Sequence, residues 1–272
     1  MEHLYDYIGE NYPYLFPMSN VVMNELTLEY TTTISSQNQF TEFSKIVQIA
    51  ASLGSISLLS AMKLSSKTFF LGEKLRMRKI PNTIVEGELK FCTKTLSFSK
   101  RKGKVLLDIF DNQAQLVYTA ELEYVIFDEA SFHQVFSSYY TEKIPVESHS
   151  IDKEIELNLV KPSYFNVHIP EVTSEQCKGH FDNYPIVPGV LIVKRLLEAI
   201  EKIFKLQGEE LQNKTLVIDS FEIFLNAAIP IHRELNSLVH YRQIAKDSYL
   251  FICPINDHKT EYANYVITVT LY

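Results

Sequence analysis

The chain has 272 residues, 46% of them hydrophobic, which is enough apolar material for a sizeable core in one large domain or two moderate ones. Its formal charge of −7 argues against a nucleic-acid binder, because no basic face is evident that could displace phosphate counterions. The three cysteines, Cys92, Cys177 and Cys253, are odd in number and widely spaced, so they indicate a reducing compartment and we expect the cytoplasm.

Two early segments bear on membranes. Residues 1–14 carry acids and aromatics where a secretory leader would have a basic region and an apolar run, so we expect no leader. Residues 46–62 are uncharged, but they include polar and small residues and fall short of the roughly 20 apolar residues that a bilayer requires. A helix that is apolar all round is more simply enclosed by protein, and we expect no membrane span.

The first half of the chain predicts a strand, a long helix and then further strands. Residues 20–34 are rich in Val, Leu, Thr and Tyr, as strands are, and residues 41–61 form the apolar helix. Further strands are expected at residues 68–78, 84–95, 105–110 and 115–127. The basic run at residues 100–104 predicts a hairpin tip, either a solvated turn or a docking point for an acidic partner.

The second half repeats this order after a polar connection at residues 128–152. A helix is expected from residue 190 to about 204, and strands at residues 155–160, 164–169, 215–225, 237–245, 248–254 and 261–271. Because residues 73–81 align with residues 222–230, we interpret the halves as copies. Each antiparallel sheet would hide its apolar face by curving around its helix, and the sheets would join at an edge.

A loop before the second helix carries the best candidate site. Its sequence is GHFDNYPIVPGVL, residues 179–191. Pro185 and Pro188 cannot sit inside a helix, so His180 lies on the approach to a helix start. A helix N-terminus offers free backbone N–H groups to an anion or a polarised carbonyl. His180 is therefore a candidate catalytic residue, with a purely structural histidine as the alternative.

This loop resembles the GHFPGxPIxPGVL signature of the beta-hydroxyacyl-ACP dehydratases, hot-dog proteins of fatty-acid and polyketide biosynthesis. The resemblance covers the loop directly, is compatible with the strand order of the second half, and leaves the first half without the motif. It implies an α+β double hot-dog fold of two tandem units, each a curved antiparallel sheet wrapped around a long central helix. The N-terminal unit would span residues 1–135, and the C-terminal unit, with the motif, residues 150–272.

The resemblance also implies roles for individual residues. His180 would remove a proton from the carbon next to the thioester carbonyl, and the backbone N–H of Gly189 would hold the carbonyl oxygen. Lys194 stands where the family has a helix acid. Because family sites form between two units, the partner of His180 is expected in the first half, where Gln48 takes the acid's position. Glutamine can donate a hydrogen bond but cannot give up a proton at neutral pH.

The implied substrate is an acyl thioester carried on acyl carrier protein or coenzyme A. We expect an acyl tunnel beside the buried helix, with Phe181, Tyr184, Ile186, Val190 and Leu53 as substrate-binding residues. The sequence has neither metal-ligand spacing nor a nucleotide-binding glycine pattern, so no metal or cofactor is expected.

Three functions remain open on this scaffold. The first is a 3-hydroxyacyl-thioester dehydratase-like enzyme that uses His180 and Gln48. The second is a non-catalytic hot-dog subunit or acyl-binding pseudoenzyme that pairs with an active dehydratase or with a second copy. The third is a thioesterase or acyltransferase, because one fold hosts several chemistries.

Overall fold

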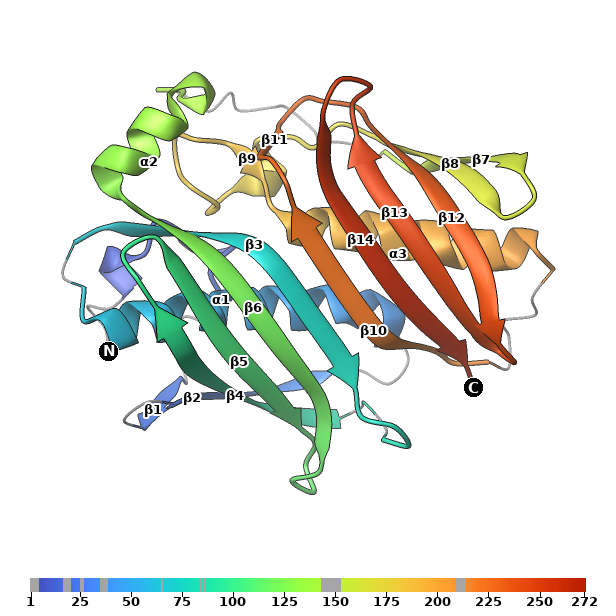
Figure 1. Cartoon of the computed structure of the whole chain (residues 1–272), viewed down its shortest axis with the longest axis horizontal. Helices are drawn as coiled ribbons and strands as arrows, with labels where there is room; N and C mark the ends of the chain where they lie inside the picture. The colour runs from blue at the N-terminus through green and yellow to red at the C-terminus, as the bar shows by residue number, and fades with distance from the viewer. Residues whose placement is uncertain are drawn as a thin grey trace.

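A computed structural model describes residues 5–16, 21–24, 27–34, 39–64, 66–83, 85, 87–142, 153–208 and 214–272. Two long helices, α1 (Gln39–Met62) and α3 (Gly189–Leu206), lie against the same face of one twelve-stranded antiparallel sheet (Figure 1). An apolar face of a sheet has to be covered, and here α1 lies mainly against strands of the first half and α3 against strands of the second.

The sheet has the order β1-β2-β4-β5-β6-β3-β10-β14-β13-β12-β8-β7. The first half contributes β1 (Val22–Asn24), β2 (Thr27–Ile34), β3 (Thr68–Lys79), β4 (Gly87–Phe98), β5 (Lys102–Phe110) and β6 (Leu116–Asp128). The second half contributes β7 (Glu156–Lys161), β8 (Tyr164–Ile169), β10 (Leu216–Leu225), β12 (Leu235–Ala245), β13 (Ser248–Asn256) and β14 (Glu261–Leu271). Two short strands, β9 (Ile186–Val187) and β11 (Ile229–Pro230), form a separate antiparallel pair.

The two halves have the same strand order around their helices and meet edge to edge. β2-β4-β5-β6-β3 in the first half corresponds to β8-β12-β13-β14-β10 in the second. At the join β3 and β10 pair antiparallel, with Leu75 opposite Ile223 and Arg76 opposite Glu222. The Arg76 guanidinium lies 3.2 Å from the Glu222 carboxylate across this pair. The join satisfies the backbone groups that each half would otherwise leave exposed at an edge.

Alternation along the strands places the core on the helix side of the sheet. In β5, Val105, Leu107 and Ile109 are fully buried and alternate with less buried residues. α1 is buried around much of its circumference. Its stretch Glu42–Met62 is the one helix among the described residues that is long and apolar enough to cross a membrane, and 67% of its most apolar window is buried inside the protein.

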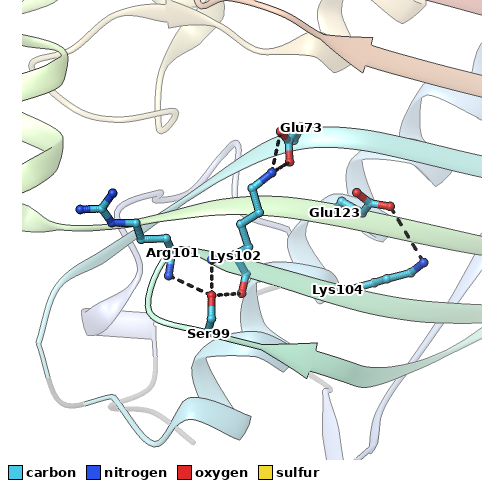
Figure 2. Close-up of polar contacts among 6 residues, drawn as sticks. All are labelled: Glu73, Ser99, Arg101, Lys102, Lys104 and Glu123. Carbon is cyan, nitrogen blue, oxygen red and sulfur yellow. Dashed lines mark hydrogen bonds and ion pairs between the residues drawn. The ribbon is translucent and has the colours of Figure 1, made fainter.

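The hairpin between β4 and β5 is shorter than the basic run predicted. Lys102 and Lys104 belong to β5, and the Ser99 hydroxyl accepts the backbone N–H groups of Arg101 and Lys102 in the turn (Figure 2). The Lys102 ammonium lies 2.8 Å from the Glu73 carboxylate. Much of the basic charge is therefore balanced within the sheet, as expected for a solvated turn.

Two other expectations about elements were wrong. The single strand expected at residues 20–34 is a hairpin in the described part of that range, because β1 and β2 pair antiparallel with Val22 opposite Glu29. The connection expected at residues 128–152 begins with a helix, α2 (Glu129–Val135), whose first turn is capped by the Asp128 carboxylate. Residues 143–152 lie outside the described part of the chain.

Tertiary packing explains why α2 forms in a polar stretch. Phe132 is fully buried and stacks on Phe69 of β3, with ring centroids 3.8 Å apart. It also contacts Phe181 of the motif loop at a centroid distance of 5.1 Å. Both partners are distant in sequence, so the local pattern of residues 128–152 does not predict the contacts that stabilise α2.

Candidate active site

A cavity of about 330 Å³ lies where the two halves meet. The pairing of β3 with β10 ends at Lys74 and Phe224, and beyond that point both strands line the cavity. Its wall is mainly apolar and includes Val47 and Ala51 of α1, Phe70 of β3, Tyr124 of β6, Val190 of α3 and Ile223 of β10. Such a concave apolar space with a few polar groups is a typical ligand site.

His180 lines this cavity with a neutral imidazole. Its Nδ1 lies 2.8 Å from the carbonyl oxygen of Ile186 and must donate to it, because a carbonyl only accepts. Nε2 is then the nitrogen with the free lone pair. Burial lowers the pKa of His180 to about 4, although the hydrogen bond to Ile186 opposes this shift. At neutral pH the motif loop therefore presents an unprotonated base.

The backbone around His180 is held in an unusual shape. Phe181 and Asn183 adopt positive φ angles of 56° and 67°, which non-glycine residues rarely do. The short pair β9 and β11 fixes the far end of the loop, with Ile186 opposite Pro230. Strained loops of this kind cluster at ligand and active sites, where the surroundings hold them in place.

The start of α3 lies in the same cavity. Gly189 is the first residue of the helix and lines the cavity, and its N-cap, Pro188, makes no side-chain capping bond. The first N–H groups of a helix have no partner within the helix, and the dipole favours negative charge there. The hydroxyl of Tyr265 donates to the carbonyl of Gly189 at 3.1 Å, which helps to fix this end of the helix.

The structure places the other predicted site residues in two groups. Phe181, Ile186 and Val190 line the cavity together with His180. Tyr184 is not among the lining residues and stacks on His133 of α2, with centroids 5.2 Å apart. Leu53 is fully buried in the core and is also outside the lining. Both therefore lie where they support the site by packing.

Gln48 is half-buried on α1 but is also outside the cavity lining. Its amide nitrogen donates to the carbonyl oxygen of Tyr14 at 2.8 Å and lies 3.4 Å from that of Pro13. The amide thus holds the N-terminal segment, which we define as residues 5–16. The catalytic role predicted for Gln48 remains a prediction.

The carboxyl group beside His180 is that of Glu10, which the sequence pattern did not predict. Its Oε1 lies 3.8 Å from Nε2 of His180, and the two side chains are only 5% and 9% exposed. Burial raises the pKa of Glu10 to about 8, so at neutral pH the contact joins a protonated acid to a neutral imidazole and is not an ion pair. A lone acid within the apolar and aromatic segment at residues 8–16 was the available signal.

The N-terminal segment docks on both halves of the protein. Gly9 donates its N–H to the carbonyl of Thr68 in β3 at 2.8 Å. Asn11 donates its N–H to the carbonyl of Gly179 in the motif loop at 2.7 Å. The ring of Tyr14 lies against the ring of His180, with centroids 4.3 Å apart. These contacts form one wall of the site from residues that belong to neither the sheet nor the long helices.

No protein-family model and no curated protein matches this sequence. Solved structures do resemble its structure. A protein assigned as an oleoyl thioesterase from Lactobacillus plantarum has a TM-score of 0.59 and 9% identity, covering 93% of this chain and 97% of its own. The tesB protein of Mycobacterium avium subspecies paratuberculosis has a TM-score of 0.57 and 8% identity, with coverages of 93% and 96%. An acyl-ACP thioesterase from Bacteroides thetaiotaomicron has a TM-score of 0.51 and 12% identity, with coverages of 90% and 98%.

The chain has a hot-dog α+β fold. Identities this low show the fold alone, and the named activities belong to those proteins. The resemblance to the dehydratases still rests on the motif at residues 179–191.

A second, much smaller cavity is present in the described part of the chain. It lies between the start of α1 and the start of β10 and holds about 10 Å³. Phe43 fills it by packing on Phe221 and Tyr118, with centroid distances of 5.2 and 6.0 Å. Lys194, at the position of the family's helix acid, is exposed on α3. The cavity at His180, about 330 Å³, is much the larger of these two cavities.

The described residues contain no group of three His, Cys, Asp or Glu side chains placed to hold a metal ion. Cys92, Cys177 and Cys253 form no disulfide. Cys177, three residues before His180, is buried and packs in the main core, as a small apolar side chain does.

We expect Gly179→Ala to destabilise the protein by roughly 3 kcal/mol or more, because a Cβ there would meet the Asn11 carbonyl oxygen at 2.4 Å and φ is +84°. Gly208→Ala is a matched control, since Gly208 has a φ of +77° with nothing within 4 Å. Its cost should be about 1 kcal/mol. Urea unfolding of both variants measures the loss of stability. If both variants lose the same free energy of unfolding, the N-terminal segment does not press on Gly179.

Proposed function

We propose that this protein acts on acyl thioesters and dehydrates 3-hydroxyacyl thioesters, with His180 as the base. The observation that carries the proposal is the position of the His180 imidazole, with Nδ1 bonded to the Ile186 carbonyl, in an apolar cavity that also reaches the start of α3. Structural neighbours named as oleoyl and acyl-ACP thioesterases support the substrate class. The dehydratase motif at residues 179–191 supports the reaction.

In the proposed reaction Nε2 of His180 takes the proton from the carbon between the thioester carbonyl and the hydroxyl-bearing carbon. Negative charge develops on the carbonyl oxygen as this proton leaves. The N–H of Gly189 at the start of α3 would hold that oxygen, and the apolar wall would strengthen this interaction. The hydroxyl group takes up a proton from an acid in the site and departs as water, leaving a 2-enoyl thioester.

We further propose a duplicated hot-dog architecture, with units at residues 1–135 and 150–272. The equal strand order of the two halves and their edge-to-edge join support it. The carrier, acyl carrier protein or coenzyme A, would approach where β3 and β10 separate, near Glu73 and Asn226 of the cavity lining.

The test is an assay of the purified full chain with 3-hydroxyacyl pantetheine thioesters of several chain lengths. Enoyl thioester and free thiol are measured in the same samples. Enoyl formation supports dehydration. Release of thiol without enoyl product would overturn dehydration in favour of a thioesterase. If the chain is inactive alone but a co-purified dehydratase requires it for activity, the chain is a non-catalytic subunit.

Val190→Phe should lower kcat/KM for the longer substrates by about tenfold or more, because the larger side chain occupies part of the cavity. Leu53→Ala is the contrasting variant, since Leu53 is fully buried outside the lining. It should cost about 2–5 kcal/mol of stability and leave the chain-length preference unchanged. A changed preference in Leu53→Ala alone would place the acyl chain elsewhere.

A further inference from the structure

We propose that Glu10 is the catalytic acid of this site and that the N-terminal segment, not a helix, brings it to His180. This inference rests on the proposed function and names the group that protonates the leaving hydroxyl. Among the described residues, neither long helix places a carboxyl group in the cavity. Lys194 is exposed, and Gln48 uses its amide to hold the carbonyls of Pro13 and Tyr14.

The geometry around Glu10 is that of an incomplete hydrogen-bonding site. Oε1 lies 3.8 Å from Nε2 of His180, too far for a direct hydrogen bond. Oε2 is buried and has no hydrogen-bond partner among the described residues. A buried polar atom without a partner is costly, so its retention calls for an explanation. A substrate hydroxyl placed between the carboxyl group and the imidazole would supply the partner.

Hydrogen bonds hold the backbone on both sides of Glu10. The preceding residue, Gly9, is bonded to Thr68 of the first half, and the following residue, Asn11, is bonded to Gly179 of the second. The Asn11 side chain also donates to the Asp182 carboxylate at 2.5 Å. Two anchors on neighbouring residues restrict where the Glu10 side chain can point. An acid delivered by a loop segment can therefore be positioned as firmly as one on a helix.

Nε2 of His180 takes the proton from the carbon next to the carbonyl, and that electron pair forms the carbon–carbon double bond. The carbon–oxygen bond to the hydroxyl breaks, and the Glu10 carboxyl group gives its proton to the departing oxygen, which leaves as water. His180 is then protonated and Glu10 ionised, and transfer of one proton between them restores both.

The protonation states fit these roles. Burial raises the pKa of Glu10 to about 8 and lowers that of His180 to about 4. Among the described residues, the hydroxyls of Tyr14 and Tyr124 also interact with Glu10, and burial raises the pKa of both well above its ordinary value. The site therefore holds a protonated acid beside a free base at neutral pH, as dehydration requires.

The experiment compares wild type, Glu10→Gln, Glu10→Asp and Glu42→Gln in the enoyl-forming assay. Glu10→Gln should lower kcat by about 10²- to 10⁴-fold with little change in KM, and Glu10→Asp should restore part of the loss. Glu42 is a matched control, an acid on α1 outside the cavity lining, and its variant should keep wild-type rates. Wild-type activity should decline above about pH 8, where Glu10 loses its proton. The residual activity of Glu10→Gln should show no such decline.

Infrared difference spectroscopy provides a readout besides activity. The carbonyl band of a buried protonated carboxyl group should be present in wild type at pH 7, fade near pH 8, and be missing from Glu10→Gln. If wild type dehydrates and Glu10→Gln does so at the same rate, the role of Glu10 is overturned while the proposed function stands. If wild type itself forms no enoyl product, the proposed function fails and the role fails with it.

A final variant separates Glu10 from Gln48 as the partner of His180. Gln48→Glu would restore a family-like helix acid and should raise kcat if position 48 reaches the substrate. We expect no gain, because a carboxylate facing the carbonyls of Tyr14 and Pro13 would loosen the N-terminal segment. An increase in kcat in this variant, retained when combined with Glu10→Gln, would overturn the proposal.

Discussion

Replacing His180 with alanine is expected to lower kcat for dehydration by about 10²- to 10⁴-fold, the usual contribution of one acid–base group. The variant removes the only imidazole among the described residues that line the cavity. It also leaves the Ile186 carbonyl without its donor, which should cost about 1–3 kcal/mol of stability. Steady-state kinetics with 3-hydroxyacyl thioesters, at a temperature where both proteins are folded by circular dichroism, measures the effect.

His240→Ala is the control for this experiment. His240 is half-buried and, like His180, lies against an aromatic ring, stacking on Tyr164 with centroids 4.6 Å apart, but it lies on β12 outside the cavity lining. Its loss should leave kcat unchanged. Activity of His180→Ala within a few-fold of wild type would instead make His180 a structural histidine that fixes the motif loop through Ile186.

Glu10→Gln is expected to make the protein more stable at pH 8 and to leave its stability nearly unchanged at pH 4. Folding raises the pKa of Glu10 to about 8, so the folded protein binds a proton that the unfolded chain releases above its ordinary pKa. The stability that this proton contributes is fully present at acid pH and is lost as the pH rises toward 8. At about 1.4 kcal/mol for each pKa unit, the difference should approach roughly 4 kcal/mol.

Urea unfolding of wild type and Glu10→Gln between pH 4 and pH 8.5 tests this expectation. The pKa of His180 is shifted in the opposite direction, to about 4, but His180 titrates in both proteins and largely cancels in the comparison. Glu42→Gln is again the control, because Glu42 is partly exposed beside Lys45 and lies outside the cavity lining. Parallel curves for wild type and Glu10→Gln would mean that Glu10 ionises normally in the folded protein.

The local pattern of residues predicted most of the fold. The alternation in residues 105–110 and 115–127 corresponds to β5 and β6, and the uncharged run at residues 46–62 lies within α1. Strand alternation is local because neighbouring side chains point to opposite faces. The same local information failed where a distant partner decides the structure, as in α2, which depends on Phe69 and Phe181.

The sequence by itself determined half of the candidate site. The motif at residues 179–191 placed His180 before a helix start with Gly189, because two prolines and a glycine restrict that backbone locally. The position expected to complete the site, Gln48, followed from the resemblance to the dehydratases, which places it where the family has a helix acid. That resemblance contains no information about the segment that packs over Gln48.

Only the tertiary structure decided which group faces His180. Glu10 lies far from the motif in sequence and belongs to no long helix or sheet strand, so periodicity contains no information about its position. It reaches Nε2 of His180 because Thr68 and Gly179, from opposite halves, hold the residues on either side of it. Its burial, and with it the raised pKa, exists only once both halves and the N-terminal segment have assembled around one cavity.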